Sequence, residues 1–160
     1  MRLHIETERL VLTPEEPGDA DWFAELLNER GAGSFSVADA LERIATMTTT
    51  INTTGIGVLV LRKRTDGEAL GYTGLVVGRS SHEEPELAYE LLPKAHGHGY
   101  ATEAARALVD AAFDTGRHRL WATISSENGP SLRVAEKLGF HRDHCTTEDG
   151  REVVWMVRDR

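Results

Sequence analysis

Three strand-type segments follow one another in the middle of the chain, and one long helix-type segment separates them from the next strand. The three strands are expected at Gly57–Arg62, Ala69–Val77 and Glu86–Leu91, and short connections make consecutive strands antiparallel. The helix is expected at Tyr100–Phe113, where apolar residues recur at helical spacing, and the next strand at His118–Ile124. A parallel pair needs a long crossover, and only this helix provides one. The sheet should therefore be mostly antiparallel with one parallel pair.

The remaining segments complete a mixed fold. A first strand is expected at Leu3–Leu12, further helices at Asp19–Glu29, Val37–Thr49 and Pro130–Leu138, and a last hairpin of Phe140–Cys145 with Val153–Val157. The threonine-rich stretch after Thr49 is a poor helix interior and is expected to fray into a loop. The expected fold class is α/β (α+β): a mixed, mostly antiparallel central sheet of about six or seven strands with about four helices, in the order β-α-α-β-β-β-α-β-α-β-β.

Composition limits the classes of protein and of partner. The 160 residues, 40% of them apolar, are expected to form a single domain, 1–160, with a core that needs no disulfide. The net charge of -8 argues against nucleic acid and anionic membrane as partners, because binding phosphate draws on clustered Lys and Arg. One cysteine, Cys145, and an N-terminus without an apolar leader favour a cytoplasmic protein.

A glycine-containing loop joins the strand Glu86–Leu91 to the helix Tyr100–Phe113, and residues 96–104 read HGHGYATEA. Glycines let the main chain approach a ligand, while the first N–H groups of a helix lack partners and lie at the positive end of its dipole. The loop is therefore a candidate phosphate site made of main chain alone. The alternative is a tight turn in which the glycines serve geometry only. A dinucleotide-binding domain fits poorly, because no repeated strand–helix–strand units follow.

Three stretches of the chain together resemble one family. ELAYELLPKAHGHGYATEAARALVDAAF, SSENGPSLRVAEKLGF and the N-terminal ETERLVL resemble the GNAT superfamily of acetyl-coenzyme A-dependent N-acetyltransferases, and look most like its ribosomal-protein-alanine (RimJ/RimL-type) branch. The family's phosphate loop is Gln/Arg-x-x-Gly-x-Gly/Ala. Gly99 and Ala101 match its last two fixed positions, whereas His96 stands where Gln or Arg is usual. The resemblance is thin between about residues 30 and 55, where the family forms part of its acceptor pocket.

The resemblance implies a GNAT-like fold and acetyl-CoA as the acyl-donor cosubstrate, with no metal. Loop N–H groups are implied to hold the pyrophosphate, and the edge of the preceding strand the pantetheine arm. The residues implied to bind acetyl-CoA are Tyr89, Glu90, Leu91, His96, Gly97, His98, Gly99, Tyr100, Ala101, Thr102 and Asn128. The family also suggests a homodimer through strand edges or the last hairpin.

The implied function is transfer of an acetyl group to a primary amine, on a protein N-terminus or a small molecule, by direct attack in a ternary complex. The amine must lose a proton, so a base is needed but no protein nucleophile. Glu86 is the candidate base, with Glu90 as its competitor, and the resemblance implies that Ser131 protonates the thiolate. The structural alternatives are a solvated strand carboxylate for Glu86 and helix caps for Ser131 and Asn128. The alternative function is a non-catalytic acyl-CoA-binding sensor.

Overall fold

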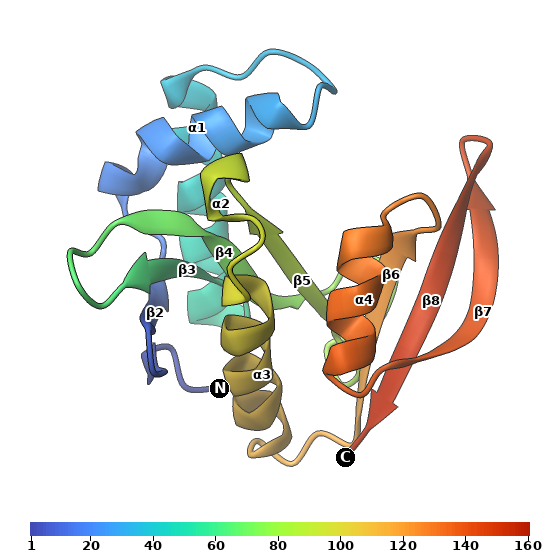
Figure 1. The fold of residues 1–160 in the computed structure, drawn as a ribbon. Helices are drawn as coiled ribbons and strands as arrows, with labels where there is room; N and C mark the ends of the chain where they lie inside the picture. Colours follow the sequence, from blue (N-terminus) through green and yellow to red (C-terminus); the bar gives the residue numbers. More distant parts are fainter.

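An eight-stranded sheet runs through the molecule, with helices on both of its faces (Figure 1). The computed structural model describes residues 1–160. Its strands are β1 (Ile5–Glu6), β2 (Leu10–Pro14), β3 (Val58–Lys63), β4 (Ala69–Val76), β5 (Glu86–Leu91), β6 (Arg119–Ser125), β7 (His141–Glu148) and β8 (Arg151–Asp159). Its helices are α1 (Ala20–Glu29), α2 (Val37–Thr54), α3 (Tyr100–Phe113) and α4 (Gly129–Lys137), with single turns η1 (Pro17–Asp19) and η2 (Pro93–Ala95).

The order of strands in the sheet is β1-β2-β3-β4-β5-β6-β8-β7. All neighbouring strands are antiparallel except β5 and β6, which are parallel and are joined through α3. The expected fold class, a mixed and mostly antiparallel sheet with four helices, is confirmed, and the one parallel pair lies at the expected crossover. The sheet has one strand more than the expected six or seven.

The additional strand arises because the N-terminal segment is divided. A single strand was predicted over Leu3–Leu12, but the chain turns at Thr7, between β1 and β2. The Thr7 N–H donates to the Leu10 carbonyl at 2.9 Å, and the Leu10 N–H donates to the Thr7 hydroxyl at 3.1 Å. That hydroxyl also donates to Glu103 of α3 at 2.6 Å. The break thus depends on a distant helix, which a local hydrophobic pattern cannot reveal.

Helix α2 does not fray after Thr49, so that prediction was wrong. The helix continues to Thr54 and ends at Gly55, which has a φ of 75° and suits a left-handed C-terminal cap. Six threonine hydroxyls in this helix each donate to the main-chain carbonyl four residues earlier, at 2.7 to 3.1 Å. The donating residues are Thr46, Thr48, Thr49, Thr50, Thr53 and Thr54. Threonine hydroxyls can be satisfied in this way inside a helix. These bonds satisfy the hydroxyls without stabilising the helix, which persists because Ile44 and Ile51 are buried and both of its ends are capped.

Two hydrophobic clusters pack on opposite faces of the sheet. The larger has 26 buried residues and joins α3 and α4 to the strands, and the smaller has 8 and joins α1 to α2. Along β5, Leu87 and Tyr89 belong to or pack against the larger cluster, whereas Tyr72 of the neighbouring β4 packs against the smaller one. Each face of the strands β4 and β5 therefore lies under a different pair of helices. None of the helices has the length and apolar character needed to cross a membrane.

Candidate active site

The glycine loop precedes α3 and leaves a run of main-chain donors without partners. Gly97 and Gly99 both have a φ of 77°, in the region that favours glycine, so each glycine serves a turn. The first hydrogen bond into the helix runs from the Glu103 N–H to the Gly99 carbonyl at 3.1 Å. The six N–H groups from Gly97 to Thr102 donate to no carbonyl. Six free amides at the positive end of a 14-residue helix form a cradle for an anion.

Side chains in the turn between β1 and β2 hold this loop in place. Arg9 donates to Glu103 Oε2 at 2.7 Å and to the His98 carbonyl at 2.9 Å, and its guanidinium lies 4.5 Å from the centre of the Tyr100 ring. The Glu103 carboxylate also accepts from the Thr7 hydroxyl, so this carboxylate points toward the turn between β1 and β2. The imidazole of His98 lies beside Tyr100 and does not line the cavity described below.

The edge of β5 that faces β6 is open, because the sheet splits between these two strands. β5 and β6 share a single paired position, Glu86 with Trp121, and the strands separate beyond it (Figure 1). Leu92 donates to the Leu70 carbonyl on β4, so in this antiparallel register the even-numbered residues of β5 bond to β4. The main-chain groups of Leu87, Tyr89 and Leu91 then point toward the open edge, while those of Glu90 point toward β4.

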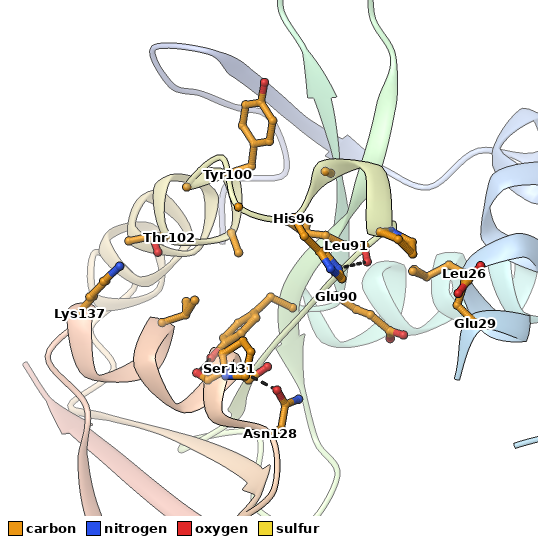
Figure 2. A pocket seen from close by; sticks show the side chains of 18 of the residues that line it. Leu26, Glu29, Glu90, Leu91, His96, Tyr100, Thr102, Asn128, Ser131 and Lys137 are labelled. Atoms are coloured by element: carbon orange, nitrogen blue, oxygen red, sulfur yellow. Dashed lines mark hydrogen bonds between the residues drawn. The ribbon is translucent and has the colours of Figure 1, made fainter. Parts of the chain in front are cut away.

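A cavity of about 860 Å³ connects the loop to this edge. Figure 2 shows it between the start of α3, the start of α4, β5 and the end of α1. Of the residues predicted to bind acetyl-CoA, it is lined by Tyr89, Glu90, Leu91, His96, Gly97, Gly99, Tyr100, Ala101, Thr102 and Asn128, together with Ser131. His96 does not aim its ring at the loop amides, because its Nε2 lies 2.9 Å from the Leu91 carbonyl.

The start of α4 supplies the polar side of this cavity. The Asn128 side chain accepts from the Ser131 N–H at 3.2 Å, so Asn128 is the helix cap that its sequence position allowed (Figure 2). The Ser131 carbonyl accepts from the Tyr89 hydroxyl at 2.6 Å, and burial raises the pKa of that hydroxyl. The hydroxyl of Ser131 makes no hydrogen bond within the protein. Among nearby cations Lys137 lines the cavity, whereas Lys94 pairs with Glu68 at 2.8 Å.

Glu86 lies in a smaller cavity of about 280 Å³, which it shares with Tyr89, Asn128 and Ser131. Only 4% of Glu86 is exposed, so it is not a solvated strand carboxylate. Its Oε2 accepts from the Thr123 hydroxyl at 2.6 Å, and its Oε1 accepts from the main-chain N–H of Arg79. The strand split thus places a buried carboxylate within the same connected space as the free Ser131 hydroxyl.

Glu90 is held by a cation, which was not foreseen. The Arg30 Nε donates to both Glu90 oxygens, at 2.9 and 3.0 Å, and the Tyr72 hydroxyl donates to Oε2 at 3.0 Å. Both oxygens of the Glu90 carboxylate are therefore occupied by partners within the protein. Arg30 comes from the end of α1, a part of the chain whose role the sequence did not indicate.

A third cavity, of about 820 Å³, lies on the other face of the sheet, under α1 and α2. It meets the Glu86 cavity at Tyr72, Val76 and Ala88, which line both. Sequence reasoning missed one of its residues, Glu15, which is 6% exposed. Nothing in the local pattern EEP marks this carboxylate as buried, because its burial depends on parts of the chain that come together only in the fold.

A family model described as an acetyltransferase (GNAT) domain matches residues 9–141. The chain belongs to the GNAT acetyltransferase family. This confirms the resemblance seen in the sequence, the acyltransferase class and acetyl-CoA as the family's acyl donor. The matched range includes the loop, both flanking helices and the split between β5 and β6.

Individual relatives and solved structures are similar to this chain over different shares of its length. The Bacillus subtilis protein YkkB is 35% identical over 89 residues, which are 54% of this chain and 52% of YkkB, so the match spans about half of that relative. A solved structure from Bordetella pertussis, assigned to the GNAT family, is 30% identical with a TM-score of 0.85, over 98% of this chain and 99% of that one. The ribosomal L7/L12 alpha-N-protein acetyltransferase RimL, solved with coenzyme A, has a TM-score of 0.84 at 14% identity over 98% and 97% of the two chains, a likeness of fold.

Proposed function

We propose that residues 1–160 form one N-acetyltransferase domain that transfers an acetyl group from acetyl-CoA to a primary amine in a ternary complex. The observation that carries the proposal is the run of six free amides from Gly97 to Thr102 beside the open edge of β5. Two linked phosphates fit the amides, and an extended amide-containing arm fits the edge. The side chain of Lys137 adds a cation on the same cavity. Cytoplasmic location and a homodimer stay predictions.

The donor then enters along one face of the sheet and the acceptor along the other. The cavities of the loop and of Glu86 share Tyr89, Asn128 and Ser131, so the donor's sulfur end reaches the strand split. The acceptor cavity under α1 and α2 opens into the same split at Ala88. The two substrates meet at β5, and the Tyr89 N–H on its open edge is the donor proposed to stabilise the oxyanion.

Proton transfer requires a base and an acid at this meeting point. Glu86 takes a proton from the bound ammonium, directly or through one water, and the free amine then attacks the thioester carbonyl to give the tetrahedral oxyanion. When the oxyanion collapses, the C–S bond breaks and the nitrogen loses its second proton to solvent, and Glu86 later returns its own proton to solvent. The Thr123 hydroxyl and the Arg79 N–H hold the Glu86 carboxylate in place. Ser131, whose hydroxyl has no partner in the protein, gives a proton to the leaving thiolate and regains one from solvent.

Two measurements test the proposal. Calorimetry with coenzyme A should show binding, and release of free thiol from acetyl-CoA should depend on an added primary amine. Glu86→Gln should reduce kcat strongly and leave the affinity for coenzyme A unchanged, because Glu86 lies away from the loop. Thr147→Val, on the exposed strand β7, serves as a control that should change neither quantity.

The outcomes separate the two candidate functions. Absence of coenzyme A binding would remove the basis of the whole proposal. Binding without thiol release, across protein N-terminal peptides and small amines, would instead favour an acyl-CoA-binding sensor. An unchanged kcat for Glu86→Gln over a range of pH would show that another group takes the proton.

A further inference from the structure

Glu15 is a buried carboxylate without a partner inside the protein. It follows the last residue of β2 and is 6% exposed. Its Oε1 is buried and has no hydrogen-bond partner. Buried carboxylates are normally paired or hydrogen-bonded, because burial of an unpaired charge is costly. Glu15 lines the cavity under α1 and α2, so its partner has room to come from outside the chain.

The other charged groups near this cavity already have partners or lie in solvent. Asp19 of η1 is bound by Arg62, at 2.9 and 2.8 Å, and by Trp22. Arg30, which follows α1, and Tyr72 of β4 both donate to the Glu90 carboxylate. On α2, Asp39 accepts from the Ser36 N–H at 2.8 Å, Arg43 lies over the Phe35 ring at 5.0 Å, and Glu42 is exposed. Glu15 is therefore the buried carboxyl group near this cavity that is paired with no cation of the protein.

Glu15 follows β2, which lies three strands away from β5, where the acetyl transfer is proposed to occur. Pro14 pairs with Leu59, Leu59 with Thr73, and Thr73 with Tyr89. Three strand spacings of roughly 4.8 Å place β2 about 14 Å from β5, whose open edge faces the opposite way. A proton acceptor must come within about 3 Å of the amine or act through one water. Glu15 is thus too far from the open edge to serve as the base, but it lies at the far end of the acceptor cavity.

We propose that Glu15 binds a second cationic group of the acceptor, at the far end of the cavity from the nitrogen that is acetylated. The inference rests on the proposed function, because it assigns the acceptor's reactive amine to the β5 end of the cavity. If Glu15 binds a second cation, the preferred acceptor is a compound with two separated positive charges. The reactive ammonium loses its proton at Glu86, and the second remains protonated against Glu15.

The proposal predicts a pH dependence for such acceptors. Burial, followed by repulsion from Asp19, raises the pKa of Glu15 to about 7. The carboxylate binds a cation only when ionised, so the affinity for a dication should increase as the pH rises through about 7. A monoamine has no group for Glu15, so its affinity should lack this step.

The experiment compares linear diamines with monoamines of equal chain length. Diaminobutane, diaminohexane and diaminooctane are each titrated by calorimetry into the protein saturated with coenzyme A, and each is assayed for thiol release with acetyl-CoA. Glu15→Gln should raise Kd and KM for the best diamine on the order of tenfold, the effect of losing one charge-assisted hydrogen bond, with kcat and the monoamine KM unchanged. Glu25→Gln, an exposed carboxylate of α1 outside the cavity, is the matched control for net charge.

The two readouts separate this inference from the proposed function. If diamines bind in a Glu15-dependent way but no amine promotes thiol release, the cation site stands and the transferase proposal fails. If thiol release occurs but Glu15→Gln changes diamines and monoamines alike, or neither, the cation site is refuted. The wild-type protein gives an independent result: equal affinity for a diamine and its monoamine at pH 8 also refutes the site.

Discussion

Replacing Glu15 by Gln should stabilise the fold at alkaline pH, because it removes a charge that has no internal partner. In the folded chain the pKa of Glu15 is about 7, compared with its ordinary value of 4.5. The folded state therefore holds a proton that the unfolded state has lost between these values. By linkage, the stability contributed by this group falls as the pH rises from about 4.5 to about 7, and then stays constant.

The magnitude follows from the same two values. A difference of about 2.5 in pKa, at roughly 1.4 kcal/mol per pKa unit, corresponds to up to about 3 kcal/mol of lost stability above pH 7. Gln carries no charge at any pH, and its amide occupies the same space as the protonated carboxyl. For a chain of this length about 3 kcal/mol is a change in Tm of roughly 6 to 12 °C.

Urea denaturation at pH 5 and pH 8 measures the effect. Glu15→Gln should exceed the wild type in free energy of unfolding by up to about 3 kcal/mol at pH 8 and by less than about 1 kcal/mol at pH 5, and Glu25→Gln should match the wild type at both. A Glu15→Gln variant that is less stable than the wild type at pH 8 would show that the carboxylate has an internal partner, and would refute the reasoning.

Three further predictions concern other parts of the molecule. Gly99→Ala should lower stability by about 1 kcal/mol and weaken coenzyme A binding in calorimetry, because its φ of 77° strains an L-residue; an unchanged Kd would contradict the role of the loop. Arg62→Met should cost about 3–5 kcal/mol in urea denaturation by leaving the buried Asp19 charge unpaired, and adding Asp19→Asn should restore part of the loss. Ser131→Ala should lower kcat and not coenzyme A affinity, and full activity would exclude it as the acid.

Much of the fold could be predicted because the deciding signals are local. Apolar spacing marks α3, and the Asp149-Gly150 pair adopts positive φ at both residues in the turn between β7 and β8. The crossover length identified the parallel pair without knowledge of the packing. What failed was set by other interactions: the Thr7 turn depends on Glu103, and α2 persists because Ile44 and Ile51 are buried and Gly55 caps its end.

The site divides in the same way. The loop could be predicted because glycines and a helix start make a phosphate cradle from main chain alone. The side chains could not, since their roles depend on partners from remote segments. The carboxylate of Glu90 is paired because Arg30 ends α1 beside it, and Glu86 is buried because Thr123 and Arg79 enclose it. Glu15 is unusual because its buried carboxyl lacks a hydrogen-bond partner, and no sequence pattern predicts that a partner will be lacking.

The single paired position between β5 and β6 has a thermodynamic consequence. Most of the main-chain ladder that would join the two parts of the sheet is absent, and a donor lying along the open edge would act as a removable strand. Its binding energy would then add to the stability of the whole chain, by about 2.7 kcal/mol at a hundredfold excess over Kd. We expect resistance to proteolysis to rise with coenzyme supply, which would couple the lifetime of the protein to the metabolic state of the cell.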